Sequence, residues 1–416
     1  MYGQIEVVAS DAGYSRTLLT HEVSTELERV GNQATMKKVF QIATMGFVLC
    51  VGASNPVDAQ TPKKQGVPSV QKALAKASPK KTLTLSAVGD VMMGTTKLRL
   101  RAQGRHLLKA AHRYLRGRDI VFYNNEGTFA SLDTPPHKKV RKGYSYVFRS
   151  PRIYVKWLVK AGFNMASLAN NHSYDYGWKG LYQTIKLLRR SGIVSSHNYG
   201  MVARRTIRGT KVVMVGFHTS RYGKHNVNNI PQAQEVVRKL AKKYDIVIVS
   251  FHGGSEGLRK LHVPKELERF LGERRGDVYR FAHAVIDAGA DLVLGHGPHV
   301  PRAMEIYKKR LIAYSLGNFV TSGFGIRSYL GYAPLLQVEI TTTGELVRGK
   351  VISFRQKPYR GVYRDKENKV ATLIHQLGQK DFPTTNAVAS DGSIGPTPVK
   401  EKPRPSRKTK KALKKD

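Results

Sequence analysis

The sequence predicts an α/β domain over residues 81–356 of the 416-residue chain. Two observations predict this class. Apolar runs of strand length alternate along the chain with amphipathic stretches of helix length, which is typical of α/β proteins. Polar motifs rich in Asp, Asn, Glu and His follow several of the strands, and open α/β sheets bind ligands beyond the carboxyl ends of their strands. The sequence therefore predicts one sheet edge that carries the functional site.

The predicted elements follow one another in a regular order. Each apolar run has the length of a strand, and the stretches between the runs carry apolar residues at helical spacing. Helices are predicted near residues 104–116, 151–161, 178–191, 232–243 and 277–289. The predicted strands are Leu83–Val88, Ile120–Tyr123, Phe163–Leu168, Lys211–Phe217, Asp245–Phe251, Asp291–Leu294 and Leu311–Ser315.

Residues 36–59 predict a Sec signal peptide. Two lysines follow Met36, an apolar stretch comes next, and small residues surround Ala59, after which we expect cleavage. Cleavage after Ala53 is one alternative, and an uncleaved membrane anchor is another. Because signal peptides begin near the start of a chain, Met36 is the expected initiator and residues 1–35 are expected to be an upstream, mis-annotated extension.

The one cysteine, Cys50, lies inside this apolar stretch, so the cleaved protein would have no thiol. A chain without cysteine suits an exported protein that does not rely on disulfides, and we expect a periplasmic, cell-surface or extracellular location. Residues 60–80 are polar, basic and interrupted by proline, which predicts a linker. The folded domain should begin after this linker.

The chain is strongly basic. Lys and Arg number 70 against 29 Asp and Glu, which gives a formal charge of +41. Such a surface attracts polyanions, and charge alone leaves nucleic acid, acidic polysaccharide, anionic polypeptide and anionic lipid head groups open. After a C-terminal extension of residues 357–385, residues 386–416 are poor in apolar side chains and predict a disordered basic tail. The tail acts either as a solvated end or as an electrostatic tether.

Polar side chains follow five of the predicted strands. Taken singly, each could be a turn residue or a solvated loop residue. Five such strand ends in register would instead bring carboxylates, amides and histidines to one crevice. In chain order these residues are Asp90; Asn124 and Glu126; Asn171, His172 and Asp175; His252 and Glu256; and His296 and His299.

Carboxylate and amide oxygens mixed with imidazole nitrogens suit a divalent metal such as Mn, Fe, Zn or Mg. The candidate ligands are too many for one tetrahedral ion, so the residues predict one or two ions, with a bridging carboxylate if there are two. A two-metal site activates water and holds the oxygens of a phosphoryl group, which is the chemistry of phosphoester hydrolysis. His172 would protonate the leaving oxygen, and Asp175 would orient the other ring nitrogen of this histidine.

Motifs spread over residues 82–356 resemble, in order, those of the CapA family of poly-γ-glutamate capsule synthesis proteins. They are GDVMMG (89–94), NNEG (124–127), SLANNHSYDYG (167–177), SFHGGSEG (250–257), DAGADLVLGHGPHV (287–300) and YSLGNF (314–319). The family looks like a branch of the calcineurin-like metallophosphatase superfamily. The resemblance therefore implies a four-layer α/β/β/α sandwich with a metal centre at the strand ends.

The resemblance also implies roles for individual residues. His172 matches the proton-donor position of the family. The ligand positions match Asp90, Glu126, Asn171, His252, His296 and His299. The predicted substrate contacts in these motifs and their flanks are Asn124, Glu256, Arg302 and Asn318. Arg302 would contact an anion, although an ordinary surface arginine is the default expectation in so basic a chain.

The sequence departs from these patterns at several positions. Met92 stands where phosphatases of the superfamily have a histidine, which predicts one weak or empty metal position. His296 and His299 are three residues apart where a Gly-His-x-His motif is usual, which leaves open whether both bind metal. Residues common in the CapA pattern, a leucine, a tryptophan and a second histidine, are replaced by Asn125, Gly253 and Gly297.

The motifs and the charge together predict an exported, metal-dependent hydrolase that acts on a phosphoester or on a bond in an anionic envelope or capsule polymer. The alternative is a non-catalytic member of a capsule synthesis complex, which binds and guides the polymer through its positive charge. Binding to nucleic acid or lipid alone ranks last, because it needs no strand-end ligands, and no specific nucleic acid partner is expected. Membrane association would arise through an uncleaved signal or the basic tail.

Overall fold

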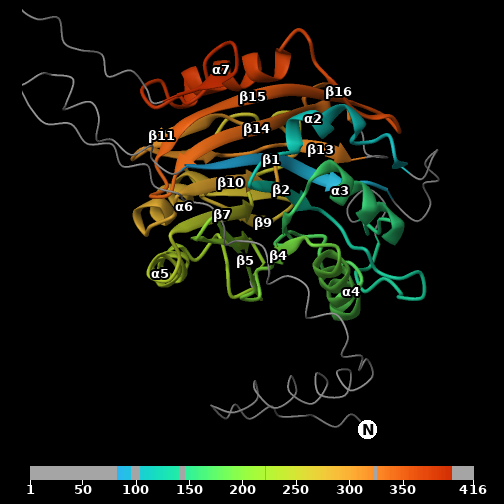
Figure 1. Ribbon diagram of the computed structural model, residues 1–416. Coiled ribbons are helices and arrows are strands. Elements are labelled where there is room, and N and C mark those ends of the chain that lie inside the picture. The colour runs from blue at the N-terminus through green and yellow to red at the C-terminus, as the bar shows by residue number, and fades with distance from the viewer. Residues whose placement is uncertain (1–81, 95–103, 141–145, 221, 322–325, 396–416) are drawn as a thin grey trace, which may run out of the picture. The chain divides into compact units, whose positions relative to one another are not determined.

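The apolar runs of the sequence assemble into two β-sheets (Figure 1). The computed structural model describes residues 82–94, 104–140, 146–220, 222–321 and 326–395. Two short strands join the larger, nine-stranded sheet: β13 (Asn318–Thr321) pairs with β1, and β17 (Ser393–Ile394) pairs with β15. The main path of this sheet runs through β16 (Gly361–Arg364), β15 (Leu346–Lys357), β14 (Tyr332–Thr341), β1 (Thr82–Met92), β2 (Ile120–Asn125), β3 (Met165–Ser167) and β4 (Val194–Ser196).

The second sheet has six strands, and a separate hairpin is formed by β8 (Glu268–Phe270) and β9 (Glu273–Gly276). At the centre of each large sheet the strands are parallel: β1 to β2 and β13, and β7 to β6 and β10. Parallel neighbours end at the same sheet edge, which is the condition for a shared site. The six strands are, in spatial order, β11 (Met304–Tyr307), β12 (Arg310–Ala313), β10 (Leu292–His296), β7 (Ile246–His252), β6 (Thr210–His218) and β5 (Val202–Ile207).

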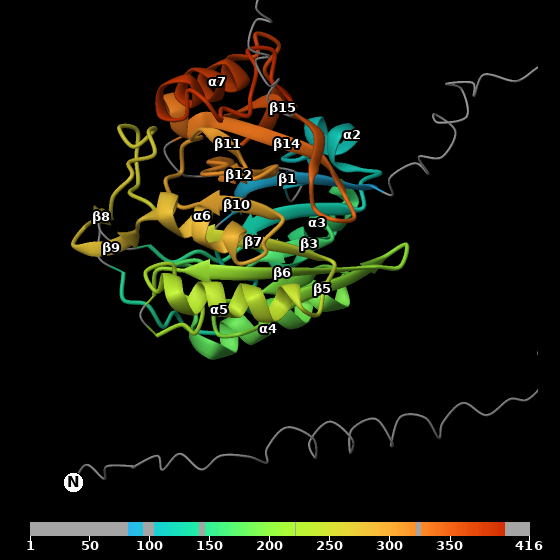
Figure 2. The ribbon, with the colours of Figure 1, turned by 90° about the vertical axis from the view of Figure 1, so that its left-hand side faces the viewer.

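Helices cover the outer faces of both sheets. An apolar cluster on the larger sheet includes buried residues of α2 (His112–Leu115), α3 (Val155–Ala161) and α4 (Gly177–Arg190). A second cluster joins the smaller sheet to α5 (Ile230–Ala241) and α6 (Val278–Asp287), which lie beside its strands in Figure 2. A third cluster fills the space between the sheets. The expected four-layer α/β/β/α sandwich is thus confirmed.

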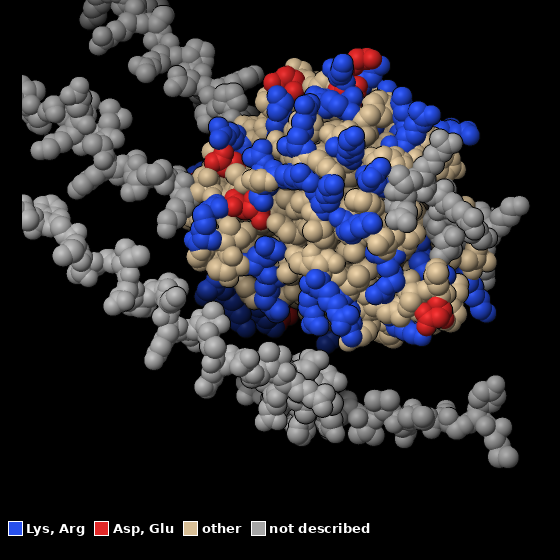
Figure 3. All heavy atoms as spheres, turned by 45° about the vertical axis from the view of Figure 1, so that its right-hand side comes forward, with Lys and Arg blue, Asp and Glu red and all other residues tan. Residues whose placement is uncertain are grey.

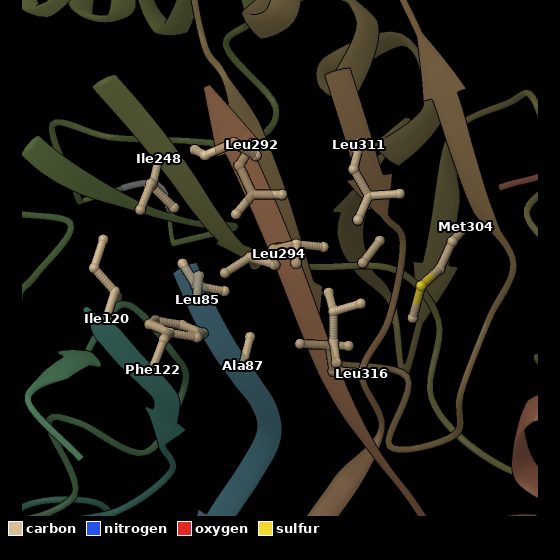
Figure 4. Close-up of a cluster of buried hydrophobic side chains, with 14 of the residues drawn as sticks. Leu85, Ala87, Ile120, Phe122, Ile248, Leu292, Leu294, Met304, Leu311 and Leu316 are labelled. Atoms are coloured by element: carbon tan, nitrogen blue, oxygen red, sulfur yellow. The ribbon is translucent and has the colours of Figure 1, made fainter. Parts of the chain in front are cut away.

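Alternate residues of the central strands serve different clusters, because side chains along a strand point to opposite faces. Ile120 and Phe122 of β2 belong to the cluster between the sheets, whereas Val121 belongs to the outer one. Figure 4 shows Phe122 facing Ile248 and Leu294 of the smaller sheet. Burial on both faces explains why these strands are continuous apolar runs. Each such large apolar side chain contributes about 1.5–3 kcal/mol to folding.

Local signals explain where several helices begin and end. At the start of α5 the side chain of Asn229 accepts a hydrogen bond from a backbone N–H, and Asp277 does the same for α6. The helix predicted near residues 104–116 is shorter than expected: a 3₁₀ turn, η2 (Lys109–Ala111), precedes the four-residue α2, and Leu108 before it offers no capping side chain. Two further 3₁₀ turns are η3 (Arg152–Tyr154) and η4 (Ser328–Gly331).

The C-terminal extension is an integral part of the fold. Helix α7 (Lys369–Asp381) places Ile374 in the cluster between the sheets and Leu377 in the outer cluster of the smaller sheet. Beyond it, the N–H of Ala387 donates a 3.0 Å hydrogen bond to the carbonyl oxygen of Met304, and β17 pairs with β15. The folded part therefore extends past the predicted start of the tail at residue 386, because main-chain pairing orders a segment with few apolar side chains.

The other predictions for the two chain ends concern residues that the structure does not describe. The predicted extension, signal peptide and linker, residues 1–80, lie outside the described residues, as do residues 396–416 of the predicted tail. Within the described ranges, no helix combines the length and the apolar character needed to cross a membrane.

Candidate metal centre

The carboxyl end of the larger sheet carries a row of polar residues. Asp90 of β1 is in register with Asn124 of β2 on one side and with Asn318 of β13 on the other. Asn124 donates a 2.8 Å hydrogen bond to Oδ1 of Asp90. The two amides thereby flank the central carboxylate, and Asn124 orients it through this hydrogen bond.

A row of histidines at the end of the smaller sheet meets this carboxylate. His252 of β7 is in register with His218 of β6 and His296 of β10. Nδ1 of His296 lies 3.5 Å from Oδ1 of Asp90, and Nδ1 of His299, in the loop after β10, lies 2.9 Å from Oδ2. The ends of the two sheets thus share one site.

Glycines allow the close backbone approach that this arrangement needs. A Cβ on Gly89 would lie 1.9 Å from the carbonyl oxygen of Gly317, which accepts a 2.9 Å hydrogen bond from the N–H of Asp90. A Cβ on Gly297, where φ is 120°, would lie 2.4 Å from the carbonyl oxygen of Gly253. A histidine at position 297 has no room here, which gives the physical reason for glycine at that position.

Asp90, Glu126 and His299 form the centre of the site. Each offers one ligand atom, and these atoms all lie within 4.8 Å of one another. Nε2 of His299 is 3.6 Å from Oε1 of Glu126. His299 has a φ of 61°, a left-handed conformation that costs free energy in a residue with a side chain. These three residues could hold a metal ion.

Several atoms of the predicted ligand residues are buried and have no hydrogen-bond partner within the described part of the chain. They are Oε1 of Glu126, Oδ1 of Asn171, Nε2 of His252 and both ring nitrogens of His296. Unpaired buried polar atoms are rare in folded proteins because each costs free energy. A divalent cation would pair with them, and carboxylate, amide and imidazole donors match the preferences of such ions. The residues therefore fit a metal.

The charges of the centre are mutually dependent. Burial, together with the carboxylates of Asp90 and Glu256, raises the pKa of Glu126 to about 8. Although burial opposes the change, the carboxylates of Glu126 and Asp90 raise the pKa of His299 to about 10. Burial opposes the change, yet the imidazoles of His296 and His299 beside the carboxylate hold the pKa of Asp90 well below its usual range. Buried carboxylates this close together favour a positive charge between them.

His172 and Asp175 form a second pair beside this centre. Nδ1 of His172 lies 2.9 Å from Oδ2 of Asp175, which also accepts a 2.7 Å hydrogen bond from the N–H of Phe148. Asn170 links the pair to the row of Asp90, because it accepts the N–H of His172 and donates to Oδ1 of Asn124, both at 3.1 Å. Burial lowers the pKa of His172 although Asp175 opposes the change. Nε2 is the nitrogen left for a ligand.

Three of the predicted substrate contacts border the centre. Asn124 is bonded to Asp90, and Oδ1 of Asn318 lies 3.2 Å from Nδ1 of His299, so both amides orient candidate ligands. Glu256 is partly exposed, and its Oε2 lies 3.8 Å from Nε2 of His299. Of the three, Glu256 is the one placed on the open side of the centre.

Arg302, the fourth predicted contact, is enclosed. It is fully buried, and its Nη1 and Nη2 donate to the two carboxylate oxygens of Glu268 at 2.8 and 2.7 Å. Its Nε donates to the carbonyl oxygen of Lys260 at 2.8 Å. This buried ion pair ties the loop after β10 to β8. The placement does not favour the predicted anion contact, because a guanidinium so occupied has little left to offer a ligand.

Two buried residues near the centre lie outside the predicted set. His218 ends β6, and its ring centroid lies 5.8 Å from that of His252. It follows the predicted strand Lys211–Phe217, so the pattern that selected His252 also applies to it. Arg275 of β9 has a side chain only 2% exposed, and its Nη2 forms an ion pair with Oε1 of Glu256 at 2.9 Å. No local sequence signal marks Arg275, because the hairpin reaches the site through tertiary folding.

Comparison with known proteins gives this geometry a family context. Residues 84–322 match the family model described as bacterial capsule synthesis protein PGA_cap. The chain is 29% identical over 269 residues to the capsule biosynthesis protein CapA of Bacillus anthracis, a match that covers 57% of this chain and 59% of the relative. It is 27% identical over 331 residues to the PGA biosynthesis protein CapA of Bacillus subtilis, covering 73% and 78%.

A third relative is the probable polyglutamine synthesis accessory protein of Mycobacterium tuberculosis, 30% identical over 224 residues, which cover 47% of this chain and 55% of the relative. The chain thus spans less than two thirds of the Bacillus anthracis and Mycobacterium tuberculosis relatives.

Solved structures show weaker likenesses. A novel phosphatase from Mycoplasma pneumoniae has a TM-score of 0.44 at 14% identity, covering 67% of this chain and 96% of that one. A 5′-nucleotidase precursor from Thermus thermophilus has a TM-score of 0.37 at 15% identity, covering 72% and 59%. Likeness at this level does not carry a function from one protein to another.

Proposed function

Because the chain belongs to the bacterial capsule synthesis protein family PGA_cap, we propose that it is a metal-dependent hydrolase that serves the synthesis of an anionic capsule or envelope polymer. One observation carries this proposal. Ligand atoms from separate strand ends converge, and several of them are buried without a partner. A protein that only bound polymer would have no need of such a constellation, because each unpaired buried atom destabilises the fold.

Asp90, Glu126 and His299 would hold one divalent ion, Mn, Fe, Zn or Mg. Donor atoms that would complete its coordination, or hold a second ion, belong to Asn171, His252 and His296. A metal at this position lowers the pKa of bound water and polarises a phosphoryl or carbonyl oxygen. Met92 supports the expectation that one metal position is weak or empty. This buried residue offers a thioether where related phosphatases carry an imidazole.

Side chains of the protein would supply the proton for the leaving oxygen. Asp175 holds Nδ1 of His172, and the N–H of Phe148 holds Asp175 in turn, so the ring cannot turn freely. Nε2 of His172 is then the atom that would give a proton to the leaving oxygen. Asn124 and Asn318 would keep Asp90 and His299 oriented throughout.

The polymer and the location of the protein are part of the same proposal. The names of the relatives refer to capsule, PGA and polyglutamine synthesis, and a polycarboxylate such as poly-γ-glutamate would be attracted to a chain of charge +41. Export through the predicted signal at residues 36–59 would bring the protein to the periplasm, the cell surface or the medium.

A non-catalytic scaffold of a capsule synthesis complex is the second candidate. The observation that favours it is the charge of +41, which would bind and guide an anionic polymer without any chemistry. The two candidates differ in turnover. A scaffold could hold a metal for structural reasons, but it would not cleave a bond.

Metal analysis of the purified protein, paired with hydrolysis of bis(p-nitrophenyl) phosphate, tests the proposal. We expect about one or two equivalents of divalent metal and measurable turnover. Asp90→Asn and His252→Gln should each lower the bound metal. His283→Gln is the matched control and should not, because this half-buried histidine pairs with Glu305, away from the strand-end site.

The outcomes separate the two candidates. Protein that carries no metal and gains none on titration with Mn or Zn would contradict the centre itself. Stoichiometric metal without hydrolysis of a phosphodiester or of an envelope polymer would favour the scaffold.

A further inference from the structure

A cationic groove lies on the helical layer that covers the larger sheet. It has a volume of about 690 Å³ and lies between the η2–α2 segment and β16. Its lining includes the basic and imidazole side chains of His106, Lys109, His112, Arg113, Arg116 and Arg364. Figure 3 shows one face of the molecule on which blue Lys and Arg side chains are widespread and red acidic ones are few. The groove brings six such basic or imidazole side chains together at one place.

Neutral oxygens, rather than carboxylates, accept the hydrogen bonds of these guanidinium groups. Arg113 donates to the hydroxyl of Tyr114, and Arg116 donates to the carbonyl oxygen of Lys160. Arg364 donates to two backbone carbonyls. The described residues that line the groove include no Asp or Glu. The positive charge of the groove is therefore left for a ligand to neutralise.

The positive charges around the groove affect the pKa of a histidine in its lining. The pKa of His112 is lowered by burial and, in addition, by the positive charges of Arg116 and Lys160. A group that resists protonation for this reason reports a positive potential, which would attract an anion.

The arrangement of the charges suits a chain better than a small ion. Lys109, Arg113 and Arg116 lie within eight residues of short helical turns, so the first and the last are roughly 10 Å apart along the axis at about 1.5 Å per residue. A small anion would contact part of this row, whereas a polymer could place successive charges along it. Among the described lining residues there is no Phe, Tyr or Trp, so the groove lacks the stacking surface that single-stranded nucleic acids use.

We propose that this groove binds a stretch of a carboxylate-bearing polymer, as a contact separate from the metal centre. Arginine suits this ligand because its planar guanidinium matches a carboxylate with two parallel hydrogen bonds. The choice of a polycarboxylate rests on the proposed function, whereas the preference for an anionic chain rests on the groove alone. A polymer held at two places binds more tightly than at either, because the second contact is intramolecular.

Binding of purified poly-γ-glutamate to the full chain tests this site. The variant Lys109→Gln/Arg113→Gln removes two exposed charges from the groove, and the control Arg238→Gln/Lys242→Gln removes two exposed charges at α5, on the opposite outer layer. At about 0.1 M salt the groove variant should bind roughly threefold to thirtyfold more weakly, the loss expected for two exposed ion contacts. The control should change affinity by less than about twofold, and the salt dependence of binding should fall in the groove variant alone.

Equal loss of affinity in the two variants would overturn the proposal, because net charge rather than the groove would then decide binding. A groove variant that loses affinity for a single-stranded oligonucleotide, but not for poly-γ-glutamate, would overturn the assignment of the polymer. Neither substitution should alter hydrolysis of bis(p-nitrophenyl) phosphate. A wild-type protein without turnover would therefore refute the hydrolase and leave the binding comparison intact.

Discussion

The imidazole of His172 and the carboxylate of Asp175 meet at 2.9 Å although nothing in their local sequence requires more than a polar turn. They are three positions apart in the chain, so a single turn is enough to bring them together. What the turn does not provide is the burial of Asp175 and the second hydrogen bond from Phe148. Those contacts make the pair rigid, as a proton-transfer group requires.

His172→Ala should therefore separate chemistry from metal binding. We expect bound metal to stay unchanged and turnover to fall by roughly 10²- to 10⁴-fold, the range for a lost general acid or base. Asp175→Asn should cause a smaller loss, because the histidine remains. Metal content and phosphodiester turnover are measured on the same samples. A His172→Ala protein that hydrolyses at the wild-type rate would remove His172 from the mechanism.

Asp119 provides a prediction on pH and stability. It bonds Arg208 and the N–H and hydroxyl of Thr84, and although partial burial opposes the change, these contacts lower its pKa to about 2. A carboxyl with a lowered folded-state pKa stabilises the fold above its ordinary pKa near 4, and this stabilisation is lost as the pH falls towards 2. Asp119→Asn should lower the free energy of unfolding by about 1–2 kcal/mol at pH 7, after allowance for the exposed arginine.

Denaturant unfolding of wild-type and Asp119→Asn protein at several pH values checks this expectation. The difference between the two should shrink from pH 4 to pH 2. Asp133→Asn is the control, because Asp133 and its partner Lys179 are both largely exposed, and it should change stability little at any pH. A gap for Asp119→Asn that stays constant down to pH 2 would show that its ionisation is not the cause.

At the scale of elements, α7 joins the two sheets. Its residue Ile374 belongs to the apolar cluster between the sheets, and Leu377 belongs to the outer cluster of the smaller sheet, so the helix packs against both clusters. Helix α7 lies beyond the predicted end of the domain at residue 356. The sequence did not show that α7 belongs to the domain, because its apolar residues have ordinary helical spacing. Only the positions of the two clusters in the structure reveal what the helix covers.

Shortened chains test this role. A chain that ends after Lys357 loses β16, α7 and β17 and exposes their partners in both clusters, so we expect it to be insoluble or unfolded. A chain that ends after Gly395 keeps every described element and should unfold at the same temperature as the full chain. Soluble yield and thermal unfolding are the measurements. A stable, cooperatively folded 357-residue protein would show that the extension is dispensable.

At the scale of the whole molecule, charge and export are linked in the proposed function. A chain of charge +41 would bind many cellular polyanions unselectively, and export would separate it from nucleic acid. Amino-terminal sequencing of secreted or periplasmic protein should find Gln60 first, or Ser54 if the earlier cleavage site is used. Intact protein starting at Met1 in the cytoplasm would contradict export.

Much of the fold could be predicted because its central strands are buried on both faces. All seven predicted strands occur, from β1 to β12, since continuous apolar runs leave little choice of structure. β14 and β15 carry weaker signals, because polar residues such as Glu339 and Arg348 alternate with apolar ones on strands that are covered less completely. The helix near 104–116 is shorter than predicted, because amphipathic spacing without a cap does not fix helix length.

The sequence by itself determined which residues stand at the strand ends. Asp90, Glu126, His252, His296 and His299 follow apolar runs, and parallel strands must end together. Only the tertiary structure decided that the ends of two different sheets face each other, that Arg275 enters from a hairpin, and that Arg302 turns inward to Glu268. Local propensity and apolar pattern determine which segments form strands, whereas the distance between atoms far apart in sequence depends on how whole layers pack.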